Sequence, residues 1–445
     1  MEEITKNTDR IIVIDSPCGF GKTSYAIQSI NSSTEDEKII YITPFLTEVD
    51  RIINSCPNKH FVQPNPAEFN GSKSKHLLSL VQKGRNIVST HALFMNISEE
   101  LIDALRINDY TLYLDEVFET VGSYNISEDE NSSPSNWNKN EIINEGDMKS
   151  LLSKKFMIMH DDYSISWADQ ENTLSKYESL KNLSERKSLF FIDEKILIWS
   201  FPVEVFREGV FSKIYVLTYL FDAQIQSLYY KYFDIDYAKY SVFKNVDESY
   251  DIELHNDAGE KEWKSKVKEK IHIIEDPKLN KIGDIYYDAQ NRPYKSALSV
   301  TWFNSNRGSD IINKLKNNIG NYYKHYVLGK ASLKMWTCFK SDIKALKDKN
   351  ITEKYWAPIN ARATNSYRDR TLLCYPVNRF TNPFLNKFFA KKNLELNQDL
   401  YAISEMIQWI WRSGIREMQD ITIYIPSQRM RTLLKQFLNN EEICF

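Results

Sequence analysis

The strongest candidates for chemistry in this chain lie in residues 11–23, which read Ile-Ile-Val-Ile-Asp-Ser-Pro-Cys-Gly-Phe-Gly-Lys-Thr. Four apolar residues predict a short buried strand, a turn-rich segment follows, and a helical pattern begins after it. A loop between a strand and a helix N-terminus can wrap an anion with backbone N–H groups, and the helix dipole favours the anion further. Lys22 would reach the β- and γ-phosphates of a nucleoside triphosphate, and the Thr23 hydroxyl would bind Mg²⁺. The segment therefore predicts a phosphate-binding loop.

The loop departs from the usual pattern at one position. The motif G-x-x-x-x-G-K-[ST] has Gly where this chain has Ser16. Serine is small enough for that turn and Gly19 adds flexibility, so we expect the loop to keep its function. ATP with Mg²⁺ is the predicted ligand, and the predicted nucleotide contacts are Ser16, Gly19, Gly21, Lys22, Thr23 and Ser24.

A pair of carboxylates follows an apolar strand pattern at Leu112-Tyr-Leu-Asp-Glu116. Asp115 would hold the Mg²⁺ that bridges the phosphates, and Glu116 would orient and deprotonate the attacking water. The alternative is a strand that ends in a solvated acidic turn. A phosphate loop upstream, with strand and helix patterns in between, favours the catalytic interpretation.

A third set of polar side chains lies near the C-terminus, at Gln408, Arg412 and Arg416. On one continuous helix these residues are four apart and would share a face. Guanidinium groups are planar, permanently charged donors that can stabilise a transferring phosphoryl group. We expect Arg412 to contact the γ-phosphate and Arg416 the transition state. A solvated helix face with two arginines is the alternative.

The elements that must position these groups alternate along the first half of the chain. Strand patterns at 38–45, 86–91 and 111–116 are separated by helix patterns at 47–54, 76–82 and 98–105. Strands alternating with helices predict a parallel, doubly wound sheet, in which ligands bind at the carboxyl ends of the strands. The sheet is expected to resume at 188–192, 195–200 and 213–220. Residues of about 120–187 interrupt it as an insertion, whose acidic, Asn- and Ser-rich part is a candidate surface for a protein partner.

The second half repeats the alternation. Strands are predicted at 297–302, 333–338, 371–376 and 421–425, and helices at 310–324, 341–346, 400–412 and 429–438. The sequence thus predicts an α/β chain with two domains, residues 1–240 and 241–445.

Composition sets outer limits on function. The 445 residues are 42% hydrophobic and 26% charged with a net charge of −3, which is typical of a globular protein and weighs against passive coating of nucleic acid. No apolar run approaches the roughly 18 residues of a membrane span, no signal peptide is evident, and five scattered cysteines form no paired motif. We expect a cytoplasmic protein without membrane partners. Residues 301–350 carry ten basic and three acidic side chains, either a nucleic-acid footprint or a solvated lysine-rich face.

Taken together, these motifs resemble the superfamily 2 helicases, which have two RecA-like domains and a DExx-type ATPase site. Residues 16–23 look like their motif I, 115–118 like motif II, and 408–416 like motif VI, although the arginines here are four apart instead of three. The set resembles the helicase-like ATPases of phages and prophages. The resemblance implies tandem RecA-like domains, ATP hydrolysis and a bound nucleic-acid strand, most simply single-stranded DNA, with RNA as an alternative.

The resemblance also implies contacts to the nucleic-acid backbone at the ends of strands. These are Thr43, Pro44, Ser89, Thr90, His91, Thr364 and Asn365, with Thr218 where a motif couples ATP to the nucleic acid. Arg429 and Arg431 begin a predicted helix, where a contact to DNA and a salt bridge are both open.

Three functions follow from these patterns. The first is an ATP-dependent helicase or translocase, encoded by a phage and active in DNA replication, recombination or repair in the bacterial cytoplasm. The second is a phage DNA-packaging motor, which also pairs a phosphate loop with an Asp-Glu strand. The third is a nucleotide-dependent module that binds nucleic acid or a partner without moving.

Overall fold

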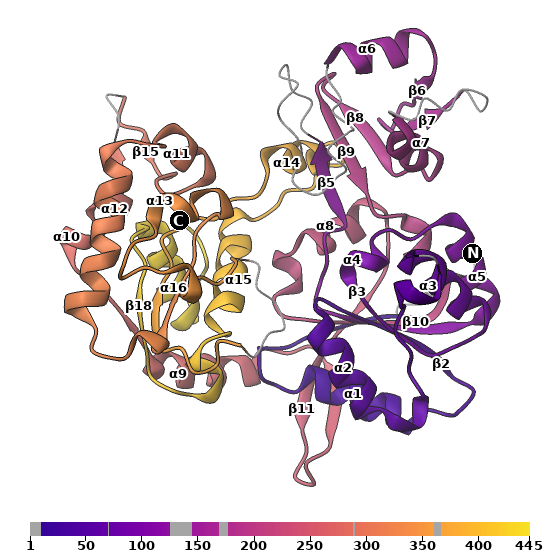
Figure 1. The fold of residues 1–445 in the computed structure, drawn as a ribbon, viewed down its shortest axis with the longest axis horizontal. Coiled ribbons are helices and arrows are strands. Elements are labelled where there is room, and N and C mark those ends of the chain that lie inside the picture. The colour runs from indigo at the N-terminus through magenta and orange to yellow at the C-terminus, as the bar shows by residue number, and fades with distance from the viewer. Residues whose placement is uncertain (1–9, 70, 125–144, 169–176, 288–289, 360–365) are drawn as a thin grey trace, which may run out of the picture.

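Two parallel-dominated β-sheets, one in each half of the chain, form the centres of the fold (Figure 1). The computed structural model describes residues 10–69, 71–124, 145–168, 177–287, 290–359 and 366–445. The first sheet has seven strands in the order β12-β11-β1-β10-β4-β2-β3, and the second has four in the order β13-β18-β17-β16. The α/β class with two RecA-like, doubly wound sheets in tandem is confirmed.

The first sheet is built from the apolar runs that the sequence pattern identified. Its strands are β1 (Ile11–Asp15), β2 (Lys38–Thr43), β3 (Ile87–Thr90), β4 (Tyr110–Asp115), β10 (Phe211–Thr218), β11 (Ala238–Lys244) and β12 (Tyr250–Leu254). All pair in parallel except β11 with β12. Side chains alternate between the two faces of a strand, so both faces need a cover of helices.

Helices cover both faces of this sheet. Ile12 and Ile14 face a core that includes α1 (Lys22–Ser32) and α2 (Leu46–Ser55), while Ile11 and Val13 face the core on the other side. That second core receives α3 (Lys73–Gln82), α4 (His91–Phe94), α5 (Glu99–Asn108) and α8 (Ile225–Tyr232). Figure 1 shows α1 and α2 below the sheet and α3 and α5 above it.

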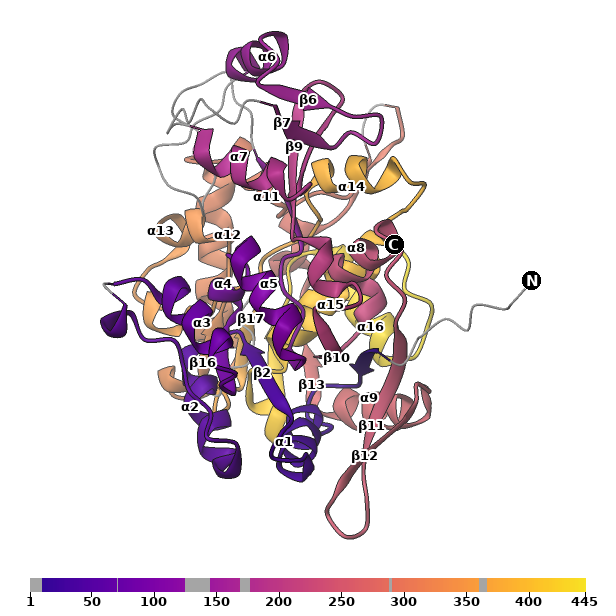
Figure 2. The same ribbon diagram turned by 90° about the vertical axis from the view of Figure 1, so that its right-hand side faces the viewer.

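The insertion forms a separate antiparallel subdomain above the first sheet (Figure 2). Its elements are β5 (Val121–Tyr124), α6 (Glu145–Ser153), β6 (Met157–Met159), β7 (Ile165–Trp167), α7 (Glu178–Glu185), β8 (Leu189–Ile192) and β9 (Ile196–Ser200). The expectation that the main sheet resumes at 188–200 is wrong, because β8 and β9 pair antiparallel with each other and β9 pairs with β5. The main sheet resumes at β10.

The second sheet consists of β13 (Ile271–Ile273), β16 (Lys334–Trp336), β17 (Leu372–Cys374) and β18 (Ile421–Tyr424), all parallel. One face packs on α9 (Ala258–Lys270), α15 (Gln398–Ile410) and α16 (Gln428–Leu438). The other face packs on α11 (Val300–Ser305), α12 (Asp310–Asn321) and α13 (Ile343–Leu346). The predicted strand at 297–302 is wrong: Ser299 accepts a hydrogen bond from the backbone N–H of Trp302 and caps α11 there.

Helix α14 (Pro383–Ala390) from the second half packs on the first half. Leu385, Phe388 and Phe389 belong to the same hydrophobic core as β4 and β10. The ring of Phe388 stacks on Tyr232 at a centroid distance of 4.3 Å. The two halves are therefore joined by a helix whose apolar face is buried against the other half.

Residue 240, at the predicted division between the two domains, lies within β11. The first sheet continues through the β11–β12 hairpin to Leu254. The hairpin projects at the lower edge of the molecule, next to β1 (Figure 1). The domain division itself stays a prediction.

Candidate nucleotide site

The loop between β1 and α1 has the backbone of an anion-binding loop. Gly19 and Gly21 have φ angles of 89° and 96°, a left-handed conformation that glycine adopts without strain. No side chain caps the N-terminus of α1, and its first turn holds no acidic residue. The first N–H groups of a helix lack intrahelical partners and attract anions. The loop curls around Lys22, whose ammonium group donates to the carbonyl oxygens of Ser16 at 2.6 Å and Pro17 at 3.1 Å.

Ser16, the departure from the motif, has a structural role. Its hydroxyl oxygen accepts a 2.8 Å hydrogen bond from the backbone N–H of Val242 in β11. Its own N–H donates to the carbonyl of Thr218 at 3.1 Å. Glycine at this position would keep the second bond and lose the first. Ser16 therefore ties the loop to the hairpin on one side and to β10 on the other.

The order of the strands brings the loop close to the Asp-Glu pair. Strand β10 lies between β1 and β4, with Thr218 paired to Asp15 and Leu217 paired to Asp115. The carboxyl ends of all three strands meet at one edge of the sheet. Thr218, the predicted coupling residue, directs its hydroxyl to the Glu116 carboxylate at 3.4 Å.

Both carboxylates at the end of β4 are buried, Asp115 with 7% and Glu116 with 9% of its surface exposed. The phenol of Tyr41 donates to Asp115 Oδ2 at 3.0 Å. Burial and then the charge of Glu116 raise the pKa of Asp115 to about 6, while the Tyr41 hydrogen bond acts in the opposite direction. Such perturbed carboxylates cluster at functional sites.

Glu116 has a strained backbone. Its φ angle is 69°, which is uncommon for a residue with a side chain, and its N–H donates to the carbonyl of Leu217 at 2.8 Å. Residues held in this conformation often occur where function fixes a side-chain direction. The chain turns away from the sheet at Glu116.

The second half contributes cations to this site. Burial raises the pKa of the Cys18 thiol in the loop, and the charged groups that act on this thiol are Lys22, Glu116, Arg412 and Arg416. Arg412 is buried and Arg416 half-buried. Charges from both halves of the chain thus influence the pKa of this one thiol.

The expected helix through Gln408, Arg412 and Arg416 is not formed. Helix α15 ends at Ile410, and Arg416 lies in a separate 3-10 turn, Gly414–Glu417. The backbone N–H of Ser413 donates to Ile410 O at 3.0 Å, as does its hydroxyl at 2.7 Å. This local bonding competes with the helix and ends it early. The prediction that these three residues share one helix face is wrong, although both arginines still lower the pKa of the Cys18 thiol in the loop.

Gln408 has an unsatisfied amide inside the protein. Only 3% of its surface is exposed, and neither its oxygen nor its nitrogen has a hydrogen-bond partner among the described residues. A buried amide without hydrogen-bond partners lowers the free energy of unfolding, and such groups are rare in folded proteins. A ligand that reaches this end of α15 would satisfy it.

Aromatic side chains hold the second half against the loop. A Cβ atom on Gly19 would lie 3.0 Å from the ring of Trp411, which directly follows α15. The Trp411 ring lies 5.0 Å from that of Trp263 on α9, and Trp263 meets the edge of Phe20 at 6.4 Å. Sequence reasoning missed these contacts, because apolar residues carry no sign of which distant segment they touch.

The predicted nucleic-acid contacts are only partly accessible. Thr43 and Ser89 are buried, with 0% and 3% exposure, and Thr90 is half-buried. Pro44 and His91 line a cavity of about 1170 Å³ between the two halves, beside α4 and α15. Thr364 and Asn365 lie outside the described residues. The cavity wall also contains Phe45, Phe118, Arg379, Phe380 and Tyr401.

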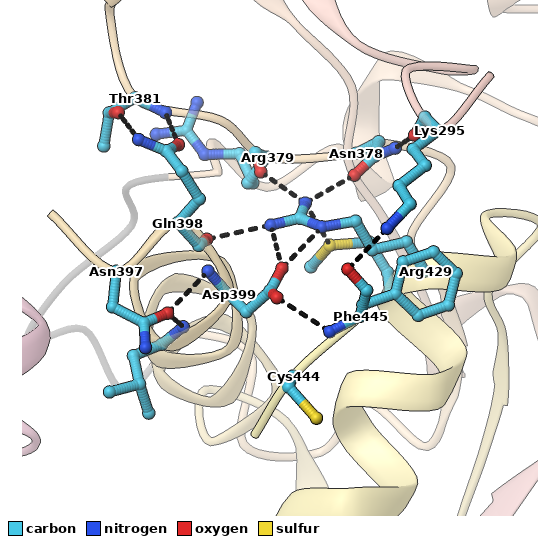
Figure 3. A network of polar contacts seen from close by, with 12 residues as sticks. Lys295, Asn378, Arg379, Thr381, Asn397, Gln398, Asp399, Arg429, Cys444 and Phe445 are labelled. Atoms are coloured by element: carbon cyan, nitrogen blue, oxygen red, sulfur yellow. Dashed lines mark hydrogen bonds and ion pairs between the residues drawn. The ribbon is translucent and has the colours of Figure 1, made fainter. Parts of the chain in front are cut away.

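Arg429 and Arg431 make salt bridges within the second half. The Arg429 guanidinium bonds Asp399 Oδ1 at 2.7 Å and donates to the Asn378 side chain and to the Arg379 and Gln398 carbonyls (Figure 3). Asp399 in turn accepts from the N–H of Phe445. Arg431 donates to the carbonyls of Ile425 and Pro426 and pairs with Asp284. The sequence left a contact to DNA and a salt bridge open for these two arginines, and the structure shows salt bridges.

The two parallel-dominated sheets, with helices on both faces, define the chain as an α/β protein. A family model described as the YonV C-terminal Rossmann-like domain matches residues 265–438, and the YonV middle domain matches 137–199. The SPbeta prophage-derived uncharacterized protein YonV of Bacillus subtilis (strain 168) is 40% identical over 442 residues, 97% of this chain and 100% of that protein. The chain belongs to the YonV family.

Two helicases are among the similar solved structures. A chain titled XPD helicase aligns with 98% of this chain and 96% of its own length, at 10% identity and a TM-score of 0.41. The DUF1998 helicase MrfA, bound to DNA and AMPPNP, aligns with 97% of this chain and 48% of its own length, at 9% identity and a TM-score of 0.35. Across the described part of the chain, none of the helices combines the length and apolar character of a membrane span.

Proposed function

We propose that this chain is an ATP-dependent nucleic-acid helicase or translocase that hydrolyses ATP between its two halves. The observation that carries the proposal is that the second half packs on the loop: a Cβ atom on Gly19 would lie 3.0 Å from the ring of Trp411, which directly precedes Arg412. Arginines supplied from a second domain are typical of sites that hydrolyse the nucleotide. Preorganised cations stabilise the transition state of phosphoryl transfer when the two halves close on the phosphates.

Each residue of the site has its own role in the proposed ATP binding and hydrolysis. The N-terminus of α1 and Lys22 bind the β- and γ-phosphates, and Glu116 orients the attacking water and takes its proton. Arg412 contacts the γ-phosphate, Arg416 the transition state, and the Gln408 amide gains a partner at the same place. The Thr23 hydroxyl and the Asp115 carboxylate are the groups that would hold Mg²⁺, which supplies charge neutralisation on the phosphates when bound.

The nucleic acid would bind in the cavity between the halves. Its wall combines a histidine, an arginine and several aromatic side chains, and such walls bind single strands by stacking and charge without reading sequence. We infer single-stranded DNA as the track, with RNA as the alternative. The prophage origin of the Bacillus relative is in keeping with a role in phage DNA replication, recombination or repair in the host cytoplasm. We also propose that the insertion binds a protein partner.

The decisive experiment measures phosphate release with ATP and Mg²⁺ in the presence of single- and double-stranded DNA and RNA. We expect ATP hydrolysis that a single strand accelerates. Hydrolysis that no nucleic acid changes would refute the motor, and no hydrolysis by wild type under any of these conditions would refute the ATPase.

A second candidate is a nucleotide-dependent binding module that does not move. The observation that favours it is α14, whose Phe388 and Phe389 are buried in the core of the first half. Lys391, just beyond α14, also pairs with Asp193 of the insertion at 2.8 Å. Such a joint restrains relative motion of the halves. A strand-displacement assay separates the two functions: a module binds the strand in the presence of ATP but displaces nothing.

A further inference from the structure

We propose that a second cavity, next to the phosphate loop, binds the nucleoside part of the nucleotide, its base and ribose. This inference rests on the proposed function and extends it, because it assigns a site for the part of the ligand that the loop does not hold. The cavity measures about 320 Å³, and its walls come from the loop, the β11–β12 hairpin and the start of α9. Ligand pockets usually begin at about 300 Å³.

The loop itself forms one wall of this cavity. Asp15, Ser16, Pro17, Gly19 and Phe20 line it. A nucleotide held by the N-terminus of α1 therefore has its nucleoside beside this wall, since the same short loop forms both sites. The opposite wall comes from residues 241–260, which are distant from the loop in the sequence.

The hairpin supplies that opposite wall. The ring of Tyr250 packs on the loop so closely that a Cβ atom on Gly21 would lie 2.0 Å from it. The side-chain amide of Gln28 in α1 donates to the Tyr250 carbonyl at 2.9 Å and accepts from its N–H at 2.8 Å. With the bond from Val242 to Ser16, three hydrogen bonds fix the hairpin to the loop and its helix.

The chemistry of the walls suits a nucleoside. Phe20 and Tyr250 contribute aromatic rings to the lining, and bases of any identity can stack on aromatic rings. Ser241, Glu253, His255 and Asn256 add hydroxyl, carboxylate, imidazole and amide groups, which can pair with the edge of a base or with ribose hydroxyls. A cavity for phosphate alone would need neither aromatic faces nor acidic edges.

Gly259, in the first turn of α9, lines the cavity and has room for a side chain that would fill part of it. A Cβ atom built there meets only the ring edge of Phe20, at an ordinary 3.5 Å. Gly259→Leu adds bulk on this wall, and leucine favours a helix more than glycine does. Lys266→Leu, on the same helix with an exposed side chain, is the matched control.

Isothermal titration calorimetry on the full chain compares ATP with inorganic tripolyphosphate, which has the phosphates and no nucleoside. We expect Gly259→Leu to weaken ATP binding by at least about tenfold and to leave tripolyphosphate binding unchanged, while Lys266→Leu changes neither. Unchanged ATP affinity in Gly259→Leu, or equal weakening of both ligands, overturns the nucleoside cavity alone. A wild type that binds no nucleotide overturns the proposed function as well.

Photolabelling needs no variant and tests the same cavity. After irradiation with 8-azido-ATP, whose reactive group is on the base, we expect the label on the peptide that spans 241–260. Excess ATP should prevent this labelling and excess tripolyphosphate should reduce it. Labelling confined to other peptides would assign the base to another site and overturn the inference, even if ATP binds.

Discussion

The phenol of Tyr41 in β2 donates a 3.0 Å hydrogen bond to the Asp115 carboxylate at the end of β4. The two residues lie on adjacent parallel strands, and both are buried. Tyr41 thereby fixes the orientation of the carboxylate and favours its charged form. A neighbouring tyrosine, Tyr113, stacks on Tyr41 with 6.1 Å between centroids but exchanges its hydrogen bond with Ser29.

We expect Tyr41→Phe to raise the Mg²⁺ concentration needed for half-maximal ATPase activity by about 10- to 100-fold, the usual effect of losing a partner behind a metal-binding carboxylate. Phosphate release against Mg²⁺ concentration measures this. Tyr113→Phe is the matched control, because it removes a buried hydroxyl from the same stack and leaves Asp115 bonded. Identical Mg²⁺ curves for the two variants would show that Tyr41 does not position the carboxylate.

Glu116→Gln should abolish hydrolysis and preserve binding. An amide keeps the shape and cannot accept the proton of the attacking water, so kcat should fall by at least about 100-fold. The ATP dissociation constant from calorimetry should change little. Glu35→Gln, an exposed carboxylate in the turn after α1, serves as the control. Normal turnover in Glu116→Gln would remove Glu116 from the proposed mechanism.

The two arginines of the second half are expected to differ in their kinetic effects. Arg416→Lys should lower kcat by about 1000-fold or more with little change in ATP affinity, as for a group that acts in the transition state. Arg412→Lys should also weaken ATP binding, since it contacts the γ-phosphate already in the ground state. Arg368→Lys, an exposed arginine in the same half, is the control. The opposite pattern would exchange the two roles.

Arg429 should matter for stability and not for nucleic-acid binding. It is 3% exposed and bonded to Asp399, so Arg429→Ala leaves a carboxylate without its cation and should cost about 3–5 kcal/mol of unfolding free energy. Arg106→Ala breaks a 2.8 Å pair with Asp103 in which both side chains are exposed, at 46% and 68%, and should cost about 0–1 kcal/mol. Urea titration measures both. Similar midpoints for the two variants would contradict the structural role.

The first half of the site could be predicted from the sequence because its signals are local. A strand, two glycines, a lysine and a helix are consecutive, and the Asp-Glu pair ends an apolar run. Parallel pairing then follows from the alternation of strands and helices. The seven-strand order, with β10 between β1 and β4, does not follow from local patterns, because the insertion separates β4 from β10 in the sequence.

The second half could be predicted only in part. The apolar pattern around Gln408 continues past Ile410, so nothing before Gly414 indicates where α15 ends; the side chain of Ser413 decides this locally. At 297–302 the β-branched residues favour a strand. There, Leu298 with a φ angle of 66° and the Ser299 cap start a helix instead. Local hydrogen bonds of a serine side chain override the wider apolar pattern at both places.

Ser16 allows a last test, because the sequence pattern and the structure lead to opposite expectations. Restoring the motif with Ser16→Gly should weaken the site: the N–H of Val242 loses its acceptor, and a lost hydrogen bond of this kind costs about 0.5–1.5 kcal/mol. Hydrogen exchange at the Val242 amide should accelerate in Ser16→Gly and in Ser16→Ala alike, since both lack the hydroxyl. Ser212→Ala removes a hydroxyl bonded to the Tyr110 carbonyl in the same sheet and should leave Val242 protected. If the Val242 amide exchanges as slowly in Ser16→Gly as in the wild type, the hairpin is held to the loop by Tyr250 and Gln28 alone.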